Sequence, residues 1–206
     1  MIRTEYREGT WIFPFVAYTP TEKKGPLPLI LQLHGAGERG DGGESLSQVD
    51  FHGFSGVVAD REFPCMLVMP QCPRDSFWAA RVESVIAFVH QLIREFNVDP
   101  HRIYLTGLSM GGYGTWYTAM ARPDLFAAIA PVCGGGMAWN AAVLRMPVWA
   151  FHGACDTVVS PAQSDEMVAA LKAAGRDVRY SRLDGVGHDV WKWAYTEELL
   201  NWLLEH

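Results

Sequence analysis

The sequence predicts an α/β protein in which helices cover both faces of a mostly parallel sheet. Apolar runs of strand length alternate along the chain with segments whose apolar residues recur at helical spacing. The internal apolar runs are almost continuous, which is typical of parallel strands buried on both faces. No repeat, low-complexity tract or linker interrupts the 206 residues, so we expect one domain over residues 1–206.

Taken in order, the apolar runs and helical patterns account for most of the chain. Strands are expected at residues 11–18, 29–33, 65–69, 103–105, 127–132, 148–151 and 178–183. The clearest helix covers residues 81–96 and is followed by Asn97-Val98-Asp99-Pro100, a stop signal and a turn. Residues 162–174, closed by Gly175, and residues 196–204 form two further helices.

The composition excludes several classes of function. A formal charge of −6 without a basic cluster argues against a nucleic-acid partner. No run of about 18 apolar residues exists, so no membrane span is expected. The first residues lack an apolar signal region. The cellular compartment is therefore not predicted, and the protein would be secreted if a signal peptide lies outside this sequence. The sequence does not decide whether Cys133 and Cys155 form a disulfide. Residues 204–206 resemble the start of a purification tag and carry no functional argument.

The stretch IYLTGLSMGGYGTW, residues 103–116, places Ser109 where a buried strand turns into a helix. Gly-x-Ser-x-Gly at such a junction is typical of a nucleophile elbow, which holds the serine hydroxyl out of the chain. The alternative is an ordinary helix start with a serine N-cap. The elbow is favoured only where a base and an acid follow in suitable places, because serine alone is a poor nucleophile.

His188 and Asp156 supply that base and that acid. With the elbow, the chain order is serine, acid, histidine, and His188 lies in a glycine-rich loop between the last strand and the last helix. Asp156 follows the strand and glycine turn of VWAFHGACD, at the edge of the sheet where ligands bind. Asp184, which also ends a strand, is the alternative acid.

An acyl transfer also needs two N–H donors for its oxyanion. One belongs to the residue after the nucleophile, here Met110, and the other to an early loop after a strand. LILQLHGAGERG provides this loop, so we assign the second donor to Ala36, with Gly37 as the alternative. Residues 35–40 also match the dinucleotide fingerprint G-x-G-x-x-G, but Asp41-Gly42-Gly43 follows where a helix is required. Nucleotide binding is therefore not expected.

With these residues in place, the chain resembles the α/β-hydrolases. It is most similar to the small esterases and "predicted peptidases" of the phospholipase/carboxylesterase and feruloyl-esterase-like branch. The motifs LILQLHGAGERG, PQCP, RIYLTGLSMGGYGTW, FHGACDTVVSPAQS and GHDVWKWAY carry the resemblance. It implies a Ser109–Asp156–His188 triad and no cofactor. No metal is expected either, because the sequence has no histidine–carboxylate cluster with ligand spacing. We expect a minimal α/β-hydrolase fold without a cap domain, and the sequence leaves open that the chain is the catalytic part of a longer protein.

The favoured function is a serine carboxylesterase acting on short-acyl or aromatic-acyl esters, either small or linked to polysaccharides. Trp78 and Trp191, next to the catalytic edge, are the predicted substrate contacts, and Trp191 matches the family's His-x-x-Trp pattern. A serine peptidase of the prolyl-oligopeptidase kind is the alternative enzyme. A hydrolase-fold binding protein is the non-enzymatic alternative.

Overall fold

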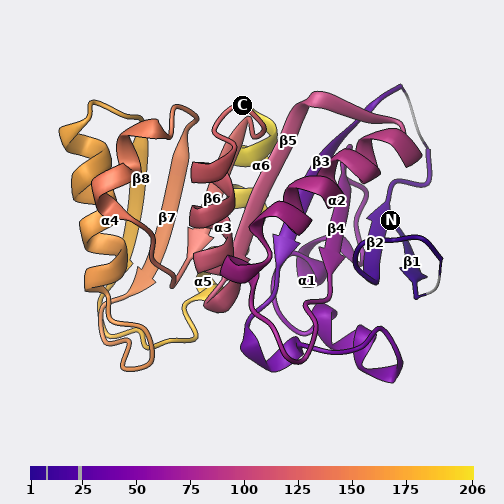
Figure 1. Cartoon of the computed structure of the whole chain (residues 1–206), viewed down its shortest axis with the longest axis horizontal. Coiled ribbons are helices and arrows are strands. Elements are labelled where there is room, and N and C mark those ends of the chain that lie inside the picture. Colours follow the sequence, from indigo (N-terminus) through magenta and orange to yellow (C-terminus); the bar gives the residue numbers. More distant parts are fainter. Residues whose placement is uncertain (8, 23–24) are drawn as a thin grey trace.

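The computed structural model describes residues 1–7, 9–22 and 25–206, and these form one eight-stranded sheet (Figure 1). The strands are β1 (Ile2–Tyr6), β2 (Phe15–Thr19), β3 (Leu27–Leu33), β4 (Met66–Pro70), β5 (Val98–Leu108), β6 (Ala128–Val132), β7 (Val148–Gly153) and β8 (Val178–Leu183). Their order across the sheet is β1-β2-β4-β3-β5-β6-β7-β8. From β4 to β8 all neighbours are parallel, while β1 and β2 run antiparallel at one edge. This topology confirms the predicted mostly parallel sheet.

Helices cover both faces of this sheet. The α-helices are α1 (Ser55–Val58), α2 (Val82–Glu95), α3 (Met110–Ala121), α4 (Ala162–Ala173), α5 (Trp191–Ala194) and α6 (Glu197–Leu204). Short 3₁₀ helices are η1 (Ala36–Glu38), η2 (Glu44–Asp50), η3 (Trp78–Ala80) and η4 (Ala138–Val143). One buried cluster joins the sheet to α2, α3 and α4, and a second joins its other face to η2, α1, α5 and α6 (Figure 1). Each internal strand therefore contributes apolar side chains to two cores.

Three of the differences between the predicted and observed strands concern the first half of the chain. Strand β1 was not predicted, because its residues alternate with charges and face solvent at the edge of the sheet. Strand β2 begins at Phe15 instead of Trp11, after Pro14. Strand β5 begins at Val98, inside the predicted turn. Just after α2 ends at Glu95, the carbonyl of Asn97 accepts from the N–H of Leu27 (2.8 Å), so pairing with β3 starts there.

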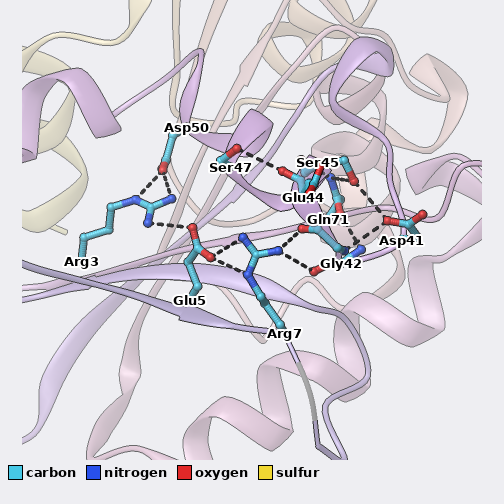
Figure 2. A network of polar contacts seen from close by, with 11 residues as sticks. Arg3, Glu5, Arg7, Asp41, Gly42, Glu44, Ser45, Ser47, Asp50 and Gln71 are labelled. Atoms are coloured by element: carbon cyan, nitrogen blue, oxygen red, sulfur yellow. Dashed lines mark hydrogen bonds and ion pairs between the residues drawn. The ribbon is translucent and has the colours of Figure 1, made fainter.

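Side chains from β1 and from the residues that directly follow β1 and β4 anchor the long segment between β3 and β4 (Figure 2). Arg3 donates to Asp50 at the end of η2 (2.6 Å), and Arg7 donates to the carbonyl oxygens of Gly42 and Gly43. The buried amide of Gln71 accepts from the N–H of Gly42 (2.9 Å) and donates to the carbonyl of Ser45 (2.8 Å). Exposed ion pairs contribute at most about 1 kcal/mol each, so the buried amide is the stronger restraint on this segment.

Candidate active site

Ser109 stands in a strained turn between β5 and α3. Its backbone has φ 54° and ψ −115°, a conformation that costs a non-glycine residue about 1–3 kcal/mol. A Cβ on Gly107 would lie 2.4 Å from the carbonyl oxygen of Gly111, and one on Gly111 would lie 2.0 Å from that of Leu33. Only glycine fits at these two positions. The packing therefore explains the Gly-x-Ser-x-Gly pattern, and it holds the serine hydroxyl at the carboxyl edge of the sheet.

His188 connects Ser109 to Asp156 through two hydrogen bonds. Its Nε2 lies 2.9 Å from Ser109 Oγ, and its Nδ1 lies 2.7 Å from Asp156 Oδ2. The alternative acid, Asp184, is exposed at the end of β8 and is not the partner of His188. The three side chains named from the sequence thus lie together, although Asp156 and His188 are 47 and 79 residues away from Ser109.

The surroundings of Asp156 keep its carboxylate charged. Burial opposes ionisation, but hydrogen bonds from His188 and from the backbone N–H groups of Val159 (2.9 Å) and Val158 (2.8 Å) outweigh it. The pKa of Asp156 is therefore held below its usual value. His152, fully buried in β7, places its Nε2 3.3 Å from Asp156 Oδ2, and burial lowers the pKa of this histidine. His152 is therefore neutral near pH 7, so it packs against the carboxylate of Asp156 without adding a positive charge.

The two predicted oxyanion donors are the first residues of their helices. Met110 begins α3 and Ala36 begins η1, and the N–H groups in a first turn have no acceptor within the helix. Ala36 and Ser109 line the same cavity of about 250 Å³. The position of these two N–H groups is compatible with the predicted role, which stays a prediction.

The two tryptophans named as substrate contacts differ in the structure. Trp191 lines the cavity with its ring edge-on to His188, at a centroid distance of 5.4 Å. Trp78 is fully buried, and its Nε1 donates to the carbonyl of His34 (3.0 Å). Its predicted contact with substrate is therefore corrected. Trp78 packs beneath residues 34–38, which include the predicted oxyanion donor Ala36 and are called the oxyanion loop below, and it fixes that loop from inside the core.

A buried histidine also holds the oxyanion loop. His34 Nε2 accepts from the N–H of Cys72 (2.9 Å), and its Nδ1 lies 2.6 Å from the carbonyl oxygen of Gly35, to which it donates. Burial lowers the pKa of His34 to about 4, so the ring is neutral near pH 7. This role of His34 was not predicted, although a histidine at the end of an apolar strand is a visible signal in the sequence.

The lowered pKa of His34 predicts a loss of stability in mild acid. The unfolded chain binds a proton at the ordinary histidine pKa of about 6.5, whereas the folded ring binds one only near pH 4. From pH 7 to pH 5 the free energy of unfolding should therefore fall by about 2 kcal/mol through this group. Urea unfolding of the wild type and of His34→Gln at both pH values measures the difference. Equal losses in the two proteins would contradict this linkage.

A buried cysteine lies beside the candidate triad. All four cysteines are free, so the bridge left open between Cys133 and Cys155 is absent. Ligand atoms of Cys133, Asp156 and His188 lie within 4.8 Å of one another, the one such group among the described residues. Burial raises the pKa of the Cys133 thiol to about 12, and metals bind the thiolate. Asp156 Oδ2 and His188 Nδ1 already bond to each other, so the ligand atoms of these two residues are occupied in the candidate triad.

The chain is similar to known hydrolases. Residues 79–143 match the prolyl oligopeptidase family, a match that includes Ser109 but ends before Asp156 and His188. A bifunctional acetylxylan esterase/xylanase of Neocallimastix patriciarum is 31% identical over 66% of this chain, and a poly(3-hydroxyalkanoate) depolymerase of Paucimonas lemoignei is 28% identical over 41%. The chain spans only 20% and 28% of these relatives. The crystal structure of a thermostable esterase superposes with a TM-score of 0.83 and 32% identity, over 99% of this chain and 62% of that one.

Proposed function

The chain is an α/β-hydrolase of the esterase and peptidase branch, and we propose that it is a serine carboxylesterase. The observation that carries this proposal is the continuous path of hydrogen bonds from Ser109 Oγ through His188 to Asp156, beside an open cavity. The similarity to esterases supports the enzyme class, a carboxylic ester hydrolase.

In the proposed mechanism His188 moves the protons. Its Nε2 accepts the proton of Ser109 while the serine oxygen attacks the ester carbonyl carbon, and Asp156 stabilises the imidazolium that forms. The N–H groups of Met110 and Ala36 donate to the oxyanion. Collapse of the intermediate breaks the ester bond, and His188 returns its proton to the departing alcohol. Water then attacks the acyl-serine by the same route, which releases the acid and restores the serine.

The substrate is proposed to be a short-acyl or aromatic-acyl ester, small or linked to a polymer. Between Ser109 and Asp156 the chain forms only α3, β6, η4 and β7, so no cap covers the site in this segment. The relatives that cleave polymers, named above as an acetylxylan esterase/xylanase and a poly(3-hydroxyalkanoate) depolymerase, support a polymer-linked ester.

Activity should be highest on short acyl chains. A deep acyl tunnel would add about 0.8 kcal/mol per buried CH₂, nearly fourfold per carbon, whereas a cavity of about 250 Å³ encloses few of them. We therefore expect kcat/KM for p-nitrophenyl esters to peak at the acetate or butyrate and to fall for longer acids. A maximum at the dodecanoate would contradict the open site.

The match to the prolyl oligopeptidase family favours a peptidase as the second candidate. A panel of p-nitrophenyl acetate, methyl ferulate and a peptide p-nitroanilide separates the two. The esterase proposal expects both esters, or the acetate alone, to be cleaved far faster than the anilide. A higher kcat/KM on the anilide would instead establish the peptidase.

A further inference from the structure

Glu38 is a buried carboxylate in the wall of the cavity that contains Ser109. The residue is 7% exposed, and its Oε2 is buried without a hydrogen-bond partner among the residues that the structure describes. Its Oε1 lies 3.6 Å from His52 Nε2, beyond ordinary hydrogen-bond distance. A carboxylate is rarely buried unless it is paired, so its position here needs an explanation.

The neighbouring His34 does not compensate this charge. Its Nδ1 lies 3.8 Å from Glu38 Oε2, and both of its ring nitrogens already bond to backbone groups. With its pKa lowered to about 4 by burial, the ring carries no charge near neutral pH. Among the residues that the structure describes, the other ionisable side chain recorded beside this carboxylate is that of His52, which lines the same cavity.

Two buried glutamines fix Glu38 and His52 in place. Gln71 donates to the carbonyl of Glu38 (3.0 Å), and Gln32 donates to the carbonyl of His52 (2.8 Å). A Cβ on Gly53 would lie 2.0 Å from the amide nitrogen of Gln32, so the segment after His52 must pass close over this amide. The backbone of both residues is therefore held by buried glutamine side chains.

We propose that Glu38 and His52 form a subsite for a hydroxyl group of the substrate, next to the ester that Ser109 attacks. Two atoms 3.6 Å apart can both lie about 2.8 Å from one oxygen atom. A hydroxyl there donates to Glu38 Oε1 and, with the His52 proton on Nε2, accepts from the imidazole, so the carboxylate gains a direct hydrogen bond that it lacks in the free protein. Trp191, 5.2 Å from the His52 ring and 5.4 Å from His188, joins the subsite to the catalytic histidine. The subsite rests on the proposed function, and its ligand is a hydroxylated ester, either of a polyol alcohol or of a hydroxy acid.

Matched pairs of esters test this subsite and separate the two sources of the hydroxyl. Propyl butyrate against 2,3-dihydroxypropyl butyrate varies the alcohol, and ethyl butyrate against ethyl 3-hydroxybutyrate varies the acid. In at least one pair the wild type should prefer the hydroxylated ester by about tenfold or more in kcat/KM, as expected for a hydrogen bond to a charged group. Glu38→Leu should bring this ratio close to one. His52→Phe keeps the ring against Trp191 and should lower the ratio at least about threefold.

Glu44→Leu is the matched control, because it makes the same substitution at an exposed glutamate of η2 and should keep the wild-type ratio. Thermal unfolding separates binding from a structural role: Glu38→Leu should melt no lower than the wild type, since an unpaired buried carboxylate does not stabilise the fold. Equal rates within both wild-type pairs, an unchanged ratio in Glu38→Leu, or a lower melting temperature of that variant would overturn the subsite. If the subsite fails but the wild type still cleaves p-nitrophenyl acetate, the proposed esterase function stands. If the wild type cleaves no ester at all, both the subsite and the proposed function are wrong.

Discussion

Ser109→Ala is expected to lower ester hydrolysis by about 10⁵–10⁶-fold, because the three groups of a serine triad act as one unit. Without the hydroxyl no acyl-enzyme can form, and the oxyanion donors alone retain only a small part of the catalysis. His188→Ala should cost about as much, since Nε2 is the group that lies 2.9 Å from the serine oxygen. The measurement is kcat on p-nitrophenyl acetate with each purified variant.

Two exposed residues provide matched controls for these substitutions. Ser47→Ala and His101→Ala make the same changes away from the cavity and should retain wild-type turnover. Circular dichroism and thermal unfolding should show that both active-site variants remain folded, because neither side chain belongs to the buried clusters. Residual activity above about 1% of the wild type in Ser109→Ala would remove Ser109 from its proposed role.

Asp156→Asn should reduce turnover by about 10⁴-fold, the second largest effect expected. An asparagine amide that donates to Nδ1 favours the tautomer with the proton on Nε2, and that tautomer cannot accept the serine proton. The loss should appear in kcat, because the substitution leaves the cavity and the two proposed N–H donors in place.

Asp184→Asn is the control for this substitution. Asp184 is exposed and was the alternative acid in the sequence analysis, so its variant should keep wild-type turnover. A larger loss in Asp184→Asn than in Asp156→Asn would mean that the wrong carboxylate had been assigned.

The residues around Ser109 could be predicted because local patterns constrain them. The elbow requires glycine at positions 107 and 111 for steric reasons, and the order of serine, acid and histidine selects the other two residues. Strand β1 could not be predicted, because an exposed edge strand lacks the continuous apolar run of a buried one. The depth of Trp78 also escaped prediction: its position along the chain is near the catalytic edge, but its ring turns into the core.

The hydrogen bonds that hold the oxyanion loop could not be predicted, because they join residues far apart in the sequence and leave no local sequence pattern. Gln71 bonds to Glu38 across 33 residues, and His34 bonds to the backbone of Cys72 across 38. The available signal was weak but real, because Gln32 and His34 interrupt an otherwise apolar strand run. A polar side chain in such a run must find a buried partner, although the sequence alone does not identify it.

Covalent labelling with a fluorophosphonate tests the central claim most directly, because the reagent reacts with an activated serine and not with an ordinary hydroxyl. We expect one adduct per chain, located by peptide mass spectrometry on Ser109 and lost in His188→Ala. Since Ser47 is exposed and lies outside the cavity, it should remain unmodified. An unlabelled protein, or an adduct on a residue other than Ser109, would contradict the proposed serine hydrolase.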